Sequence, residues 1–224
     1  MSFLDQLKKQ AEARQAEQDD GQRNVARNLK LVEAAAAIGR QYLMELGSNL
    51  EVLKPAPRVR YSFDRGVVLD GQPRADFRFD ARRKVLRDID VLDFAFIACV
   101  VRGPHDVTVS KDFVNEIEAM ERKLECAQIL HQREQVRDPA TGKLRAVRYT
   151  FDADVQVSTR MVCEHDRGTL VFVNRNLDGL ETVEVEFAAH EITQARMDEL
   201  ARWWVGEPHR FFDHALAVKR VEAR

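Results

Sequence analysis

The chain lacks any hydrophobic run long enough to cross a bilayer. Its longest apolar stretch, Phe94 to Val101, has eight residues, whereas a membrane-spanning helix needs about 20. The opening residues, MSFLDQLKKQ, also lack the apolar core of a secretory signal. Cysteine is scarce, and the three cysteines, Cys99, Cys126 and Cys163, are widely spaced. An odd number of separated cysteines without an export signal predicts reduced thiols in a cytoplasmic protein that does not bind membranes.

Motifs of several common enzyme classes are missing as well. The chain has no phosphate-binding loop, no glycine fingerprint for dinucleotides, no Gly-x-Ser-x-Gly and no Cys-x-x-Cys pair, so we expect no cofactor. The formal net charge is -2, which gives no global attraction to nucleic acid or to an anionic membrane. The predominance of arginine over lysine suggests a GC-rich bacterial genome.

Helical patterns occupy the first 50 residues. Residues 1–20 contain good helix formers but few apolar side chains, so we expect a weakly anchored N-terminal helix there. Asp19-Asp20-Gly21 predicts a break, and a second helix should run from about Arg23 to Leu46 with an apolar stripe on one face. Gly47 is expected to end it. Residues 21–224 are predicted to form one domain, which could contain two related halves, 21–110 and 111–224.

Strand patterns dominate the rest of the chain. VRYSFD (59–64) and VRYTFD (147–152) both alternate Val, Tyr and Phe with polar residues, which is typical of strands with one buried face. We interpret their similarity as convergence on this pattern, with duplication as the alternative. The run Phe94 to Val101 is apolar on both sides and predicts a central strand covered on both faces.

The remaining patterns complete the predicted architecture. A central helix should follow a Ser110 cap, with an apolar face at helical spacing, although residues 126–136 fit either its tail or a strand. The residues expected on this face are Phe113, Ile117, Met120, Leu124 and Ala127. Residues 138–143 predict a hairpin loop, residues 192–204 a closing helix, and Phe211 with Phe212 should dock the tail. Strands joined by hairpins, with N-terminal, central and C-terminal helices, predict an α+β fold with a largely antiparallel sheet of about seven to nine strands.

Two groups of residues are weak candidates for chemistry. Cys163 and His165 share one side of a predicted strand, so they could act as a nucleophile with its base or as zinc ligands. Asp88, Asp90 and Asp93 cluster near the start of a buried strand and could hold magnesium or calcium, but they do not fit the calcium-loop pattern. The structural alternative for Cys163 and His165 is a buried thiol beside a histidine at the end of a strand. For the three aspartates it is a solvent-exposed strand start.

Charge is unevenly distributed along the chain. Residues 58–87 contain nine basic and four acidic residues, whereas residues 176–200 contain one basic and seven acidic residues. An RNA-binding sheet needs aromatic and arginine side chains on the same exposed face. The aromatic residues in the basic segment alternate against its arginines (Tyr61, Phe63, Phe77 and Phe79), which disfavours nucleic acid as a partner. We expect instead that outward rows containing Arg58, Arg60 and Arg78 oppose Glu184 and Glu186, within one sheet or across a dimer interface.

These observations favour a non-enzymatic module that binds a protein partner or a second copy of itself. The wide apolar stripe on the second predicted helix is the main reason, since such a face must be covered. One alternative is a metal-dependent hydrolase or nuclease that uses the clustered aspartates. A further alternative is a binder of small molecules or nucleic acid on the concave side of a curved sheet.

Overall fold

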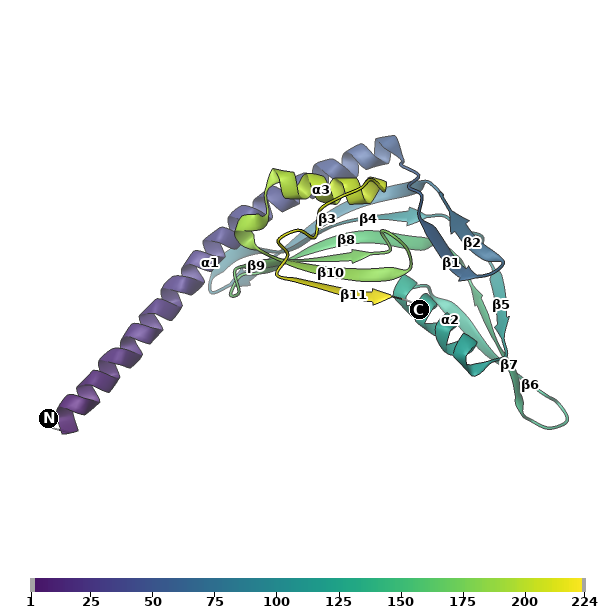
Figure 1. Cartoon of the computed structure of the whole chain (residues 1–224), viewed down its shortest axis with the longest axis horizontal. Helices are drawn as coiled ribbons and strands as arrows, with labels where there is room; N and C mark the ends of the chain where they lie inside the picture. The colour runs from purple at the N-terminus through teal and green to yellow at the C-terminus, as the bar shows by residue number, and fades with distance from the viewer. Residues whose placement is uncertain (1–2, 223–224) are drawn as a thin grey trace.

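The computed structural model describes residues 3–222, with side chains described from residue 23 to residue 221. These residues form three α-helices, one short 3-10 helix and eleven strands, arranged as an arch from which one helix projects (Figure 1). The helices are α1 (Phe3–Leu53), α2 (Val114–Ala127), η1 (Ala189–Glu191) and α3 (Gln194–Val205). The α+β class and the antiparallel pairing of all paired strands are confirmed.

The larger sheet has six strands in the order β11-β10-β9-β8-β4-β3. Its members are β3 (Arg74–Leu86), β4 (Ile89–Val101), β8 (Val155–Glu164), β9 (Thr169–Arg175), β10 (Glu181–Ala188) and β11 (Ala217–Glu222). Sequential strands are joined mainly by tight turns. Between β3 and β4 the turn residues Arg87 and Asp88 both have positive φ, 51° and 62°, which is the backbone of a type I′ hairpin turn.

Two smaller sheets form the descending limb of the arch (Figure 1). One has the order β5-β7-β6, and the other pairs β1 with β2. Their members are β1 (Arg60–Asp64), β2 (Val67–Asp70), β5 (Val107–Lys111), β6 (His131–Arg137) and β7 (Leu144–Phe151). Helix α2 buries Ile117, Met120 and Leu124 in the core beside them.

The two similar hexapeptides lie in different sheets, in β1 and β7. In both copies the Val, Tyr and Phe side chains are buried, as the alternating pattern predicts. The ring centroids of Phe63 and Phe151 lie 5.5 Å apart, so the two copies pack against each other. The demand for an amphipathic strand is the same in both copies, and convergence and duplication both stay predictions.

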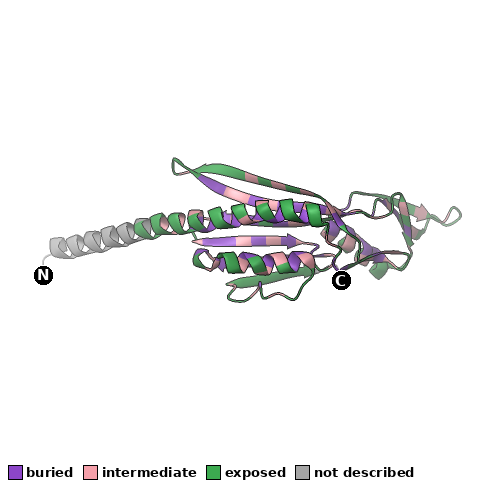
Figure 2. Ribbon diagram, turned by 90° about the horizontal axis from the view of Figure 1, so that it is seen from above, coloured by how far each residue is buried: buried purple, intermediate pink, exposed green. Residues whose placement is uncertain are grey.

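Helices α1 and α3 run side by side across one face of the six-stranded sheet (Figures 1 and 2). In α1, Ala36, Leu43 and Leu50 are buried against the sheet. In α3, the indole Nε1 of Trp204 donates to the hydroxyl of Thr159 on β8, at 2.9 Å. The predicted docking of the tail is confirmed, because Phe211 is buried and Phe212 packs partly against the core.

Several predicted boundaries were wrong. The expected break at Asp19-Asp20-Gly21 and the expected stop at Gly47 both lie inside the continuous helix α1. Gly47 is buried where the helix meets Ile97, so it serves close packing there. Ser110 lies in β5 and caps no helix. Phe113, expected on the apolar face of the central helix, precedes α2 at its N-cap position and is exposed. Residues 126–136, which fitted either a helix tail or a strand, contain the end of α2 at Ala127 and most of strand β6. Strand β11 was not predicted.

Two chain segments cross closely where the six-stranded sheet gives way to the three-stranded one. Gly103 donates its N–H to Asp154 Oδ1 at 2.9 Å, and Ala153 donates its N–H to the carbonyl of Pro104 at 3.0 Å. A Cβ atom on Gly103 would overlap the carbonyl of Ala153. Because the obstacle is backbone, only a shift of one whole segment could relieve it.

The first prediction concerns this crossing. Gly103→Ala should lower the free energy of unfolding by about 1–3 kcal/mol, the usual effect of inserting volume into a packed site. Gly66→Ala is the matched control, since a Cβ there meets nothing within 4 Å, and it should change stability by less than about 0.5 kcal/mol. Urea unfolding followed by tryptophan fluorescence measures both, and equal midpoints for the two variants would contradict the close crossing.

Candidate functional site

Cys163 and His165 both lie at the inner side of the sheet. Cys163 is buried on the covered face of β8, and burial raises the pKa of its thiol to about 12. His165 is also buried, and its Nε2 lies 2.9 Å from Glu33 Oε1 on α1. Among the described residues no hydrogen bond joins His165 to Cys163, and the contact with Glu33 fixes the imidazole against α1.

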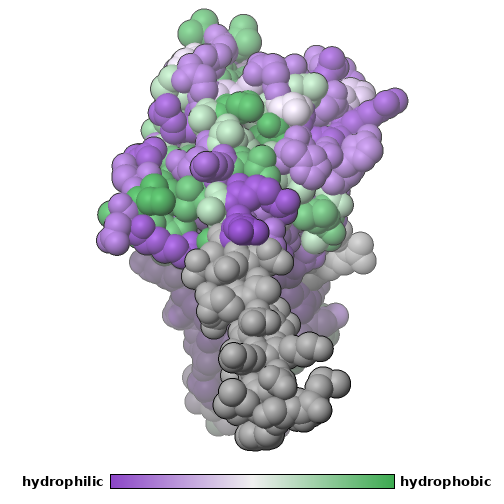
Figure 3. All heavy atoms as spheres, turned by 90° about the vertical axis from the view of Figure 1, so that its left-hand side faces the viewer, coloured by the Kyte–Doolittle hydropathy of each residue, from purple (hydrophilic) through white to green (hydrophobic). Residues whose placement is uncertain are grey.

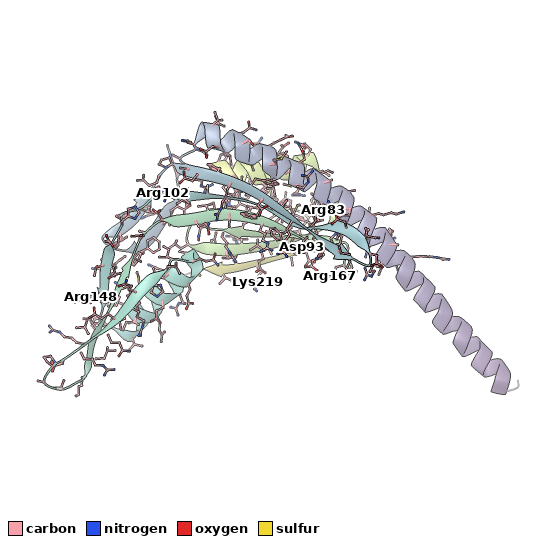
Figure 4. All side chains as sticks on the ribbon, turned by 180° about the vertical axis from the view of Figure 1, so that it is seen from behind. Arg83, Asp93, Arg102, Arg148, Arg167 and Lys219 are labelled. Atoms are coloured by element: carbon pink, nitrogen blue, oxygen red, sulfur yellow. The ribbon has the colours of Figure 1, made fainter. Side chains whose placement is uncertain are left out.

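The three candidate aspartates are engaged separately. Asp88 sits exposed in the β3–β4 turn. Asp90 accepts a hydrogen bond from Arg83 Nε at 2.6 Å, and Asp93 pairs with Lys84 Nζ at 2.8 Å, at the end of the sheet where Figure 4 labels Arg83 and Asp93. No group of three potential metal-ligating side chains occurs in the part of the chain that the structure describes.

The expected pairing of outward arginine and glutamate rows within one sheet was wrong. Strand β3, which carries Arg78, is separated from β10 by three strands, and Arg60 lies in the two-stranded sheet. Glu184 instead pairs with Lys219 of β11 at 3.9 Å, and Glu186 with Arg167 at 2.7 Å. These pairs are local to one edge of the sheet.

The face of the six-stranded sheet opposite α1 and α3 carries a cavity of about 370 Å³. Its lining comes from five neighbouring strands. It consists of Arg78, Phe94, Phe96, Ala98, Gln156, Ser158, Arg160, Val162, Val173, Arg175 and Glu184. In β4 and β8 these residues alternate with those on the side that the helices cover, so the cavity lies on the side of the sheet that faces away from α1 and α3 (Figure 1).

Arginine and phenylalanine side chains interleave in this cavity. The guanidinium carbon of Arg160 lies 3.8 Å from the ring centroid of Phe94, and that of Arg78 lies 6.0 Å from the ring centroid of Phe96. In the strand register Arg160 is directly opposite Phe96, and Arg78 is opposite Ala98. The guanidinium groups of β3 and β8 therefore flank the two rings of β4 from both sides, in the geometry of cation–π pairs.

The positive charge of this arginine cluster is not neutralised within the cavity. In the part of the chain that the structure describes, Arg78 and Arg160 have no carboxylate within ion-pair distance. Arg175 donates to the neutral amide oxygen of Gln128, at the end of α2, at 2.8 Å. The only acidic lining residue, Glu184, is close to Lys219. The described cavity therefore presents three guanidinium groups to one carboxylate that already has a cationic neighbour.

This site was not predicted from the sequence, because the apolar run Phe94 to Val101 was expected to be covered on both faces. Phe94 and Phe96 are only half-buried and line the cavity. The aromatic residues of the basic segment were expected to face inward, away from its arginines. This prediction is confirmed, since Tyr61 and Phe63 are buried and Phe77 and Phe79 pack against the core. The available signal was the alternation of β8, in which Gln156, Ser158 and Arg160 fall on the side away from the core.

Comparison with known proteins found no matching family, curated protein or solved structure. No helix in the described part of the chain combines the length and the apolar character needed to span a bilayer.

The second prediction concerns the cysteines. Burial raises the pKa of Cys99 and Cys163 to about 12, so at about pH 8 only roughly one molecule in ten thousand carries either thiolate, which is the reactive form. Cys126 is half-buried. With an aromatic disulfide reagent the native protein should therefore release one equivalent of chromophore quickly, and three only after denaturation. Cys126→Ser should abolish the fast phase. A fast phase that survives in this variant and is lost in Cys163→Ser would restore Cys163 as a nucleophile.

Proposed function

We propose that this protein is a non-catalytic binding module whose ligand occupies the open face of the six-stranded sheet. The ligand is an anion that also carries a planar aromatic group. The observation that supports this most directly is the Arg160 guanidinium stacked 3.8 Å above Phe94 without a described acidic partner. The cytoplasmic location predicted from the reduced cysteines belongs to the same proposal.

The chemistry of the lining residues matches such a ligand. A guanidinium offers a planar fork of N–H donors that suits carboxylate or phosphate oxygens. The contact with Phe94 holds the Arg160 guanidinium within the lining of the cavity, where a ligand could reach its N–H donors. Phe96, Val162 and Val173 add apolar surface, so the ligand would be held by stacking as well as by charge.

The non-catalytic part of the proposal rests on the composition of the lining. Apart from arginine, Glu184 is the only titratable residue in the described lining. General acid–base chemistry needs a group that can exchange a proton near the working pH. An arginine stays charged and lacks this property, so the described lining offers one carboxylate and no histidine, cysteine, lysine or second carboxylate beside it.

A second candidate function is self-association through α1. Leu31 and Ile38, 43% and 40% exposed, are one heptad apart, and the exposed Ala34 lies between them on the same side of the helix. This is the a-d-a spacing of a short coiled-coil seam. The end of the molecule from which α1 projects also carries hydrophobic residues among hydrophilic ones (Figure 3). The proposed occupant of this stripe is α1 of a second copy of the chain.

The third prediction tests the open face with 8-anilinonaphthalene-1-sulfonate, a planar aromatic anion. Arg160→Ala should weaken its binding tenfold or more, because a hydrogen bond to a charged group contributes about 1.5–3 kcal/mol. Arg148→Ala removes the same charge from the three-stranded sheet, which Figure 4 places apart from Lys219 on the six-stranded sheet. Fluorescence titration of both variants gives the comparison. Equal affinities in the two variants, or no binding by the wild type, would contradict the proposal.

The fourth prediction tests self-association. The double variant Leu31→Gln, Ile38→Gln should shift the protein toward the monomer, because it removes the apolar seam while keeping helix-compatible side chains. Leu130→Gln is the control, since Leu130 is 95% exposed but lies outside α1. Size-exclusion chromatography with light scattering measures the mass. A wild type that is monomeric at all accessible concentrations would count against this second function.

A further inference from the structure

We infer that the ligand of the open sheet face is a single-stranded nucleic acid. The inference rests on the proposed function and narrows it from an aromatic anion to a chain in which phosphates and planar bases alternate. Three features of the cavity carry it: its extent across the sheet, its stacking surfaces and the positions of its charges.

The extent of the cavity suits a chain-like ligand. Its lining begins with Arg78 on β3 and ends with Glu184 on β10, four strand intervals away. Neighbouring strands lie about 4.8 Å apart, so these positions are separated by roughly 19 Å across the sheet. A single small anion would engage only part of this distance. A single strand laid across β3, β4, β8, β9 and β10 would engage all of it.

Two stacking surfaces lie side by side within this length. The ring centroids of Phe94 and Phe96 are 6.2 Å apart, with an angle of 36° between the rings. The Arg160 guanidinium lies over Phe94, and Phe96 is a second ring beside it with Arg78 at 6.0 Å from its centroid. Unpaired bases stack on both aromatic rings and arginine planes, largely without regard to sequence. A base that is paired inside a duplex does not present its face in this way.

The charges are placed where the backbone of such a strand would pass. Arg78, Arg160 and Arg175 come from β3, β8 and β9, so they lie on both sides of the two rings. Gln156 and Ser158, next to Arg160 on the same side of β8, supply uncharged polar groups for base edges or a ribose hydroxyl. Glu184, at the far end, is able to accept an N–H bond from the exocyclic amino group of a base.

The formal net charge of -2 limits the affinity but does not oppose the inference. Electrostatic binding to a nucleic acid depends on the phosphates that are contacted, and each contact releases counterions. Three arginine contacts to a single strand predict that the logarithm of the association constant falls with the logarithm of salt concentration with a slope of about -2. Removal of one arginine should make this slope shallower by about 0.7.

The fifth prediction uses the full chain and a fluorescein-labelled single-stranded RNA of about 12 nucleotides, within the usual range of site sizes. Fluorescence anisotropy between about 50 mM and about 200 mM salt should give the slope of about -2. Arg160→Ala should weaken binding at least tenfold and flatten the slope, and Phe94→Leu should weaken binding several-fold at an unchanged slope. Arg148→Ala should leave both values as in the wild type. Because Arg160 is exposed, its variant keeps the test valid if Phe94→Leu fails to fold.

The other arms of the experiment separate this inference from the proposed function. Single-stranded DNA of the same sequence shows which groups of the nucleic acid are recognised. Equal affinity for RNA and DNA supports recognition of bases and phosphates alone, and tighter RNA binding supports a contact to the ribose hydroxyl. A duplex that binds as well as the single strand would overturn the inference, since paired bases do not stack on the rings. The inference would also be overturned if adenosine monophosphate bound as tightly as the 12-nucleotide strand, or if only the naphthalenesulfonate bound. Either of these two results would leave the proposed function standing. Failure of every ligand, the naphthalenesulfonate included, would overturn both.

Discussion

The structure depends on the close packing of α1 against one face of the six-stranded sheet. A Cβ on Gly39 would overlap the sulfur of the buried Met161, and Gly47 lies against Ile97, so small residues let the helix approach the strands. Helix α3 covers the rest of this face, and α2 packs in the limb with the smaller sheets. Helices α1 and α3 thus lie on one side of the six-stranded sheet. In the described chain the opposite side carries the cavity, which the end of α2 reaches through the hydrogen bond from Arg175 to Gln128.

A buried arginine joins the helical layer to the sheet. Arg74, at the start of β3, is fully buried and donates hydrogen bonds to the carbonyls of Trp204 and Leu177, with the Trp204 ring 5.3 Å from its guanidinium carbon. Arg74 therefore connects the end of α3 and the β9–β10 connection to the edge strand. An arginine without a carboxylate partner can be buried only where backbone acceptors face it, so these carbonyls constrain where α3 ends.

Much of the fold was predictable because local patterns and tertiary packing agree for most elements. The alternation in both hexapeptides, the 3.6-residue period of α2 and the hairpin loop at Asp138 were read correctly from neighbouring residues alone. The errors arose where distant contacts decide the outcome. Gly47 was expected to end a helix by its local conformation, but its packing against Ile97 lets the helix continue. Phe94 and Phe96 belong to an apolar run, and no sequence period tells which side of such a strand a helix will cover.

The candidate site lies on β4, where the sequence does not tell which side of the strand a helix covers. A continuous apolar strand is expected where both faces are covered, and β4 has this composition although only one of its faces is covered. The half-buried rings of Phe94 and Phe96 would be costly to leave in water, and the guanidinium groups of Arg78 and Arg160 shield them. Under the proposed function, a ligand with planar groups takes over these contacts with the rings, and its anionic groups engage the arginine N–H donors. The arginine side chains therefore account for how aromatic residues remain on the side of the sheet that α1 and α3 leave uncovered.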